Sequence, residues 1–256
     1  MMENWNNGML KIYRQTFGIK GPDAACALQL FVLALLCVVC GGCASANRMQ
    51  KSSLLLHPDT LEMNRSAPEI FKVWLETSKG DIIIEVHRDW APQGADRFYN
   101  LVRACYYDGA RFFRVIEGRW AQFGINGDPK VANLWRTQFF PDDPAGQSNV
   151  RGTIAFAFAV TNGRTAQVFI NLRDNSATHD REPFVPFGKM ISGMEVADAL
   201  NAEYSESAGG GIRGGKQDPI FQGGNRYLEE RFPHLDYVKK AVVIEERNHT
   251  SLTTPQ

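Results

Sequence analysis

The chain is 256 residues long and 44% of its residues are hydrophobic, which allows one sizeable core with segments to spare. Its 28 basic and 28 acidic residues cancel, and no basic stripe is interleaved with aromatic residues, so neither nucleic acid nor acidic substrates are expected as partners. Of the 5 cysteines, only Cys105 falls in the expected globular part, and the folded domain is therefore expected to lack an internal disulfide.

The segment 24–43 is almost wholly apolar and follows a basic stretch that ends at Lys20, which is a membrane-targeting pattern. It fits a lipoprotein signal with Cys43 as the lipidated residue, a cleaved signal ending at residues 44–46, or an uncleaved anchor of about 20 residues. The Gly-Gly-Cys ending resembles a bacterial lipobox, and we favour a lipoprotein or an uncleaved anchor over full release. We expect the domain to lie outside the cytoplasm, in a bacterial envelope, with a eukaryotic secretory lumen or secretion as the alternative.

Composition divides the chain into four parts. Residues 1–46 form the targeting or anchor segment, and residues 47–67, which are polar and poorly patterned, are expected to form a flexible tether. Residues 68–247 form the folded domain, of which about 201–247 is an extension. Residues 248–256 are expected to be a disordered tail.

The domain is expected to open with a β-hairpin. Residues 71–76 and 82–87 are rich in β-forming side chains and are separated by Ser-Lys-Gly-Asp at 78–81, a turn signal. A helix follows, because Pro92 suits a first helical turn and apolar residues then recur at helical spacing up to the Asp-Gly pair at 108–109. We expect this helix to cap a sheet.

The stretch 112–124 predicts two short strands joined at the Glu-Gly turn at 117–118. Alternation along a strand places Arg114 on one face of the first strand and puts Gln122 on the same face as Trp120 of the second. A guanidinium and a carboxamide would then project from neighbouring strands among aromatic residues. Such a pair can hold a peptide bond, since the Arg donates hydrogen bonds and the Gln donates or accepts them.

A long loop is expected at 125–150. The elements predicted after it are strands at 153–158, 167–172 and 185–190, short helices at 193–200 and 225–232, and a closing strand at 238–246. Many short strands with two capping helices predict a mainly β, antiparallel barrel. The histidines show no metal-ligand spacing and no Gly-x-Ser-x-Gly elbow occurs, so neither a metal site nor that hydrolase site is expected.

Several motifs together resemble the cyclophilins, which are peptidyl-prolyl isomerases. They occur in the family's order: Lys-Gly-Asp-Ile from residue 79, Tyr-Tyr-Asp-Gly from 106, Phe-Arg-Val-Ile-x-Gly from 113, Gln-Phe-Gly from 122, Gln-Val-Phe-Ile-Asn from 167 and Pro-Phe-Gly-Lys from 186. The stretch from Gly224 resembles an extension found in a mainly bacterial branch. The resemblance implies a closed eight-stranded antiparallel barrel capped by two helices.

The resemblance also implies which residues act, on proline-containing peptides and unfolded protein clients. Arg114 would donate to the prolyl nitrogen, Gln122 would hold the peptide backbone, and Phe169 would form the floor of the proline pocket. The other residues implied at the substrate-binding surface are Phe113, Trp120, Arg119, Ala157, Gln167 and Phe184. Neither a metal nor an organic cofactor is implied.

Departures from the family pattern keep a second function open. Arg119 and Trp120 stand where the family usually has Phe-Met, Ala177 and Thr178 replace an aromatic-Leu wall, and Phe184 stands where many members have His. One hypothesis is an active isomerase that assists folding outside the cytoplasm. The alternative is a membrane-tethered peptide-binding module with little or no turnover. In both, the chain is expected to be a monomer.

Overall fold

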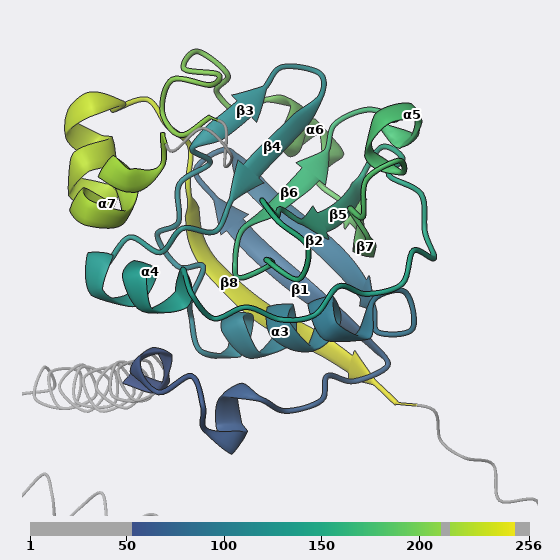
Figure 1. The fold of residues 1–256 in the computed structure, drawn as a ribbon. Helices are drawn as coiled ribbons and strands as arrows, with labels where there is room; N and C mark the ends of the chain where they lie inside the picture. The colour runs from purple at the N-terminus through teal and green to yellow at the C-terminus, as the bar shows by residue number, and fades with distance from the viewer. Residues whose placement is uncertain (1–52, 211–215, 249–256) are drawn as a thin grey trace, which may run out of the picture. The chain divides into compact units, whose positions relative to one another are not determined.

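The structure is a computed structural model that describes residues 53–210 and 216–248 (Figure 1). The apolar segment 24–43, the lipidation candidate Cys43 and nearly all of the predicted tail lie outside the described residues. Within the described ranges, no helix is both long enough and apolar enough to span a membrane.

Eight strands form one antiparallel sheet. They are β1 (Ile70–Thr77), β2 (Gly80–His87), β3 (Arg114–Ile116), β4 (Trp120–Phe123), β5 (Thr153–Phe156), β6 (Val168–Asn171), β7 (Pro186–Ser192) and β8 (Val238–Arg247). Their order across the sheet is β3-β4-β6-β5-β7-β2-β1-β8. The predicted mainly β, eight-stranded antiparallel fold is confirmed, and each strand lies close to its predicted range.

The sheet forms a half-barrel, so the expected closed barrel is corrected. β3 and β8 stand at the two ends of the strand order, and the described residues form no ladder between them. Just before these strands begin, an isolated antiparallel bridge joins Arg111 to Tyr237, and the amide of Phe112 donates to the carbonyl of Asp236 at 2.9 Å. β3 is 3 residues long and turns away at once into β4, so it cannot follow the 10-residue β8.

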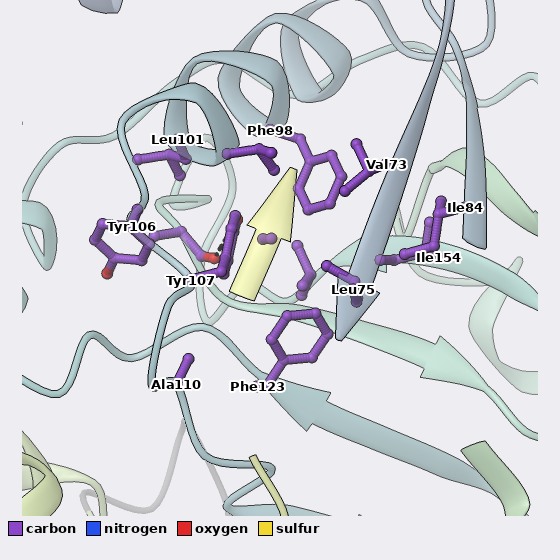
Figure 2. Close-up of a cluster of buried hydrophobic side chains, with 14 of the residues drawn as sticks. Val73, Leu75, Ile84, Phe98, Leu101, Tyr106, Tyr107, Ala110, Phe123 and Ile154 are labelled. Carbon is purple, nitrogen blue, oxygen red and sulfur yellow. Dashed lines mark hydrogen bonds between the residues drawn. The ribbon is translucent and has the colours of Figure 1, made fainter. Parts of the chain in front are cut away.

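Alternating side chains fill the core beneath a long helix, α3 (Pro92–Arg103), as the sequence predicts. In β1 every second residue is buried, and α3 buries Phe98 and Leu101. Figure 2 shows both helical side chains in one cluster with Val73 and Leu75 of β1, and Phe98 lies beside Val73. Pro92 occupies the first helical turn, where its missing N–H costs nothing.

Within the part of the chain that the structure describes, four further α-helices follow α3. They are α4 (Pro129–Trp135), α5 (Ser176–His179), α6 (Met194–Asp198) and α7 (Asp218–Arg231). α6 was predicted, whereas α4 lies inside the predicted loop 125–150. Asp128 accepts a hydrogen bond from the amide of Lys130 at 2.8 Å and acts as the N-cap of α4. α7 begins before the predicted 225 and is interrupted at Gly224, which has φ 57°.

The described part of the predicted tether is packed against the domain. Leu55 and Met63 are 3% and 4% exposed and join the main core. The indole Nε1 of Trp135 donates to the carbonyl of Leu55 at 2.8 Å, and the side chain of Asn100 donates to the carbonyl of Arg65 at 2.7 Å. This stretch is polar on average, so its composition does not show that a few apolar residues attach it to the core.

The extension builds a second core beside the sheet. Its α7 packs against α4, and the two lie side by side in Figure 1. The buried residues of this second core are Phe113, Ile125, Ala132, Ala208, Ile220, Phe221, Leu228 and Leu235. Because Phe113 directly precedes β3, the extension is packed against the strand that carries Arg114.

Truncating Leu55 tests whether the residues before β1 belong to the domain. We expect Leu55→Ala to lower the free energy of unfolding by about 2–5 kcal/mol, since it removes buried methyl groups. Leu61→Ala is the matched control, because Leu61 is 88% exposed in the same segment, and its effect should stay within about 0.5 kcal/mol. Urea unfolding of both variants measures this. Equal losses would show that Leu55 is not seated in the core.

Candidate active site

Arg114 and Gln122 face each other across the β3–β4 pair. They are partners in the ladder, and this register puts their side chains on the same side of the sheet. Nη1 of Arg114 donates to Oε1 of Gln122 at 3.2 Å. Gln122 is 2% exposed, whereas the side chain of Arg114 keeps 21% of its surface open to solvent. The pair therefore presents one partly open cation with a buried amide behind it.

Three glutamine side chains continue this contact into the protein. Nε2 of Gln122 donates to Oε1 of Gln167 at 2.9 Å, and Nε2 of Gln167 donates to Oε1 of Gln217 at 2.8 Å. A guanidinium can only donate, so Gln122 must turn its oxygen toward Arg114 and its NH₂ group away from it. That constraint fixes the direction of the amides behind it. Gln167 was predicted at the site, and Gln217, from the extension, was not.

A carboxylate from the extension holds the other edge of Arg114. Nη2 of Arg114 donates to Oε1 of Glu206 at 2.6 Å, and Nε lies 3.1 Å from both carboxylate oxygens. The two residues are 92 positions apart in the chain, so no local pattern points to their contact. Sequence reasoning missed Glu206 for that reason.

Phe169 lies next to Gln122, on β6, in a small apolar cluster outside the main core. The cluster, called here the Phe169 cluster, consists of buried Ala155, Ala157 and Phe169 with partly buried Trp120 and Phe184 packed against them. Its neighbours along β6, Val168 and Ile170, belong to the main core instead. Two-residue alternation thus places Phe169 on the opposite face of the sheet from the core.

Trp120 carries two guanidinium groups on its indole ring. The Cζ atoms of Arg114 and Arg119 lie 5.1 Å and 4.7 Å from the ring centroid, within the range of cation–π attraction. Arg119 itself is exposed. The guanidinium of Arg119 therefore lies over Trp120, and Trp120 supplies apolar surface to the Phe169 cluster.

His179 adds an imidazole to this cluster that the sequence did not predict. Its ring centroid lies 5.4 Å from that of Trp120, 5.3 Å from that of Phe169 and 5.0 Å from that of Phe184. Nδ1 is buried and has no hydrogen-bond partner in the described structure. Ala177 and Thr178, which the resemblance places at the wall of the site, are exposed on α5. The short helix turns His179 inward, so that it contributes ring surface beside Phe169.

Comparison with known proteins identifies the family of this chain. Residues 72–219 match a family model described as "Cyclophilin type peptidyl-prolyl cis-trans isomerase/CLD". The chain belongs to this family of isomerases. Over 141 residues, it is 33% identical to peptidyl-prolyl cis-trans isomerase A of Dickeya dadantii, covering 54% of this chain and 74% of that protein. It is also 33% identical over 141 residues to peptidyl-prolyl cis-trans isomerase CYP18-1 of Arabidopsis thaliana, covering 50% and 81% of the two chains.

A solved cyclophilin shares the fold of this one. The crystal structure of a cyclophilin-type isomerase from Cryptosporidium parvum superposes with a TM-score of 0.50 and covers 70% of this chain and 99% of its own, at 19% sequence identity. The resemblance inferred from the motifs is confirmed, and this cyclophilin is a peptidyl-prolyl cis-trans isomerase.

Buried asparagines hold the segment that carries His179 and Phe184 in this cyclophilin. Asn171 of β6 donates to Asn149 at 3.2 Å and accepts from Asn175 at 2.8 Å. Asn149 in turn donates to Oδ1 of Asp180 at 2.8 Å and to the carbonyl of Phe184 at 2.7 Å. Partial burial acts to raise the pKa of Asp180, but the hydrogen bonds from Ser148 and Asn149 outweigh it and lower that pKa. The network ties the short α5 to the sheet.

Phe113 is placed apart from the other predicted site residues. It is 1% exposed and belongs to the second core with α7, whereas the remaining predicted residues lie in or beside the Phe169 cluster or in the chain of glutamines. Phe113 packs against the extension in this structure, and its contact with substrate stays a prediction. Within the described ranges, no group of three or more His, Cys, Asp or Glu residues is placed to hold a metal ion.

The pH dependence of folding tests the position of His179. Burial lowers the pKa of His179; Arg119 and Arg114 act in the same direction, while Glu182 and Asp180 oppose them. The native state then binds fewer protons at this residue than the unfolded chain does, so its contribution to stability falls as pH drops below the usual histidine pKa of about 6.5.

We expect His179→Phe, which keeps a ring in the cluster, to reduce the loss of stability between about pH 7 and pH 5 relative to the unmodified protein. Urea unfolding at several pH values measures the difference. Parallel stability curves would show that the imidazole is not desolvated.

Proposed function

We propose that Arg114 accelerates cis/trans rotation by donating a hydrogen bond to the prolyl nitrogen, while Gln122 holds the peptide backbone and the proline ring rests on the Phe169 cluster. One observation carries this proposal. Arg114 pairs with Gln122, and Gln122 pairs with Phe169, so a donor, an amide and an aromatic ring follow one another in a single row across β3, β4 and β6.

The spacing of this row suits a short peptide. Neighbouring strands lie about 4.7–4.9 Å apart, so the row extends about 10 Å from Arg114 to Phe169. Consecutive Cα atoms of a peptide are about 3.8 Å apart, and an X-Pro unit with its flanking amides covers a similar length. A proline seated on Phe169 would therefore bring its nitrogen toward the guanidinium.

The chemistry requires a donor and no bond-making side chain. Rotation is slow because amide resonance must be broken, at a barrier of roughly 18–20 kcal/mol. In the twisted state the lone pair of the prolyl nitrogen leaves conjugation and becomes a better acceptor. A guanidinium held in advance by Gln122 then stabilises the twisted state more than either planar isomer, which is the condition for catalysis.

We further propose that the enzyme assists the folding of proline-containing clients outside the cytoplasm, held at a membrane by a lipid on Cys43 once the apolar segment before it is cleaved. The apolar run, its basic flank and the lipobox-like ending at Cys43 support this placement. Mass spectrometry of the mature protein extracted from membranes tests the form of attachment. We expect a chain that begins at an acylated Cys43, and a full-length chain recovered from the membrane would point to a helix anchor instead.

Replacing Arg114 separates catalysis from binding. We expect Arg114→Ala to lower turnover of an Ala-Pro-Phe peptide by about 10²–10³-fold, as loss of a preorganised donor does, while part of the peptide affinity remains on the Phe169 cluster. Exchange NMR of the peptide gives the rate, and peptide shifts give the affinity.

Arg226→Ala is the control for that experiment, because the side chain of Arg226 is 87% exposed on α7, and its turnover should be unchanged. Equal turnover in Arg114→Ala and the unmodified protein would refute the assignment of Arg114. Binding without acceleration by the unmodified protein would favour the alternative of a peptide-binding module.

A further inference from the structure

We propose that Glu206, in the extension, is a positioning residue that orients Arg114 for catalysis. This inference rests on the role proposed for Arg114 and assigns the extension a part in the active site. The contact is a bidentate one: Nη2 of Arg114 donates to Glu206 at 2.6 Å, and Nε lies 3.1 Å from each carboxylate oxygen. Planar guanidinium and carboxylate groups that meet in this way fix each other's orientation.

The edge of the guanidinium that Glu206 occupies matters for catalysis. Glu206 takes the side edge formed by Nε and Nη2, and Gln122 takes a hydrogen on Nη1. A guanidinium has five N–H donors, so one on Nη1 and one on Nη2 remain for a peptide. Held on two sides, the side chain keeps those donors aimed in one direction. Without Glu206, the Nε edge would lose its only carboxylate partner among the described residues.

Glu206 is itself held by its neighbours in the extension. Its carbonyl accepts from the amide of Gly210 at 2.8 Å, which closes a turn, and Ala208 is 2% exposed in the second core. Gly209 fits against Phe113 so closely that a Cβ atom there would lie 2.6 Å from the phenylalanine ring. The carbonyl of Gly209 also accepts from Gln217 at 3.3 Å, at the end of the glutamine chain.

The extension therefore contacts the reactive row from two directions. Glu206 reaches Arg114 directly, and Gln217 reaches Gln122 through Gln167. The turn closed by Gly210, the buried Ala208 and the carbonyl of Gly209 all belong to the extension. The packing that holds Phe113 before β3 therefore also sets the position of the Glu206 carboxylate. This arrangement favours a device that positions Arg114 over a chance surface contact.

The urea midpoint and kcat together separate a structural role of Glu206 from a positioning role. The side chain of Glu206 is 46% exposed, and pairs this open to solvent contribute little to folding. Its removal should therefore leave the urea midpoint almost unchanged. A positioning role predicts a loss in kcat. A wrongly oriented Arg114 would stabilise the twisted state less, while binding of the planar peptide would hardly change.

The test compares substitutions at Glu206 in the full chain. We expect Glu206→Ala to lower kcat for an Ala-Pro-Phe peptide by about 10- to 100-fold with little change in KM. Glu206→Gln retains an oxygen that can accept from Nε or Nη2, and its kcat should stay close to that of the unmodified protein. Glu203→Ala is the matched control, since Glu203 lies in the same segment and pairs with His234 at 3.0 Å, and its kcat should be unchanged.

Each outcome decides between the alternatives. An unchanged or raised kcat in folded Glu206→Ala would overturn the inference, because the carboxylate would then be idle or competing with the peptide. If Glu206→Ala does not fold, Glu206→Asp, which withdraws the carboxylate by one methylene group, should show the same selective loss in kcat, and an unchanged kcat there would also overturn it. If Arg114→Ala retains full activity, the role proposed for Arg114 fails and this inference falls with it. If only Arg114→Ala loses activity, the inference alone fails.

Discussion

The register between β3, β4 and β6 is the constraint on which the site depends. It places Arg114 opposite Gln122, and Gln122 opposite Phe169. A slip of one residue in either pair would turn these side chains to the other face of the sheet and bring core residues in their place. Because Val168 and Ile170 are buried in the main core on that other face, burial of the core enforces the register of the site.

Hydrogen-bond direction extends this constraint beyond the sheet. Arg114 can only donate, so Gln122, Gln167 and Gln217 are polarised in one sense away from it. The carboxylate of Glu206 can only accept, and it holds the opposite edge of the same guanidinium. The extension therefore contributes to both sides of the row, and its buried residues pack against Phe113 just before β3. The same contacts therefore pack the extension against the sheet and hold Arg114 in place.

Sequence reasoning succeeded where a single local period decides the structure. Strand and turn signals predicted that Arg114 and Gln122 project from neighbouring strands, and turn signals predicted the β1–β2 hairpin. It failed where distant segments meet. Glu206 reaches Arg114 across 92 positions, and His179 turns inward because Asn171, Asn175 and Asn149 tie its short helix to the sheet. Closure of the barrel also depends on residues that are far apart in the chain. No local sequence pattern predicts the isolated bridge between Arg111 and Tyr237.

Peptide-induced NMR shifts of two side-chain N–H groups test the central claim most directly. Nε–H of Arg114 belongs to the row, and Nε1–H of Trp120 is buried without a hydrogen-bond partner in the described structure, beside the Phe169 cluster. Titration with Ala-Pro-Phe should shift both resonances together, at concentrations where the cis and trans signals of the peptide begin to exchange. Shifts confined to residues away from β3, β4 and β6, with both of these signals unmoved while the peptide exchanges, would contradict the account.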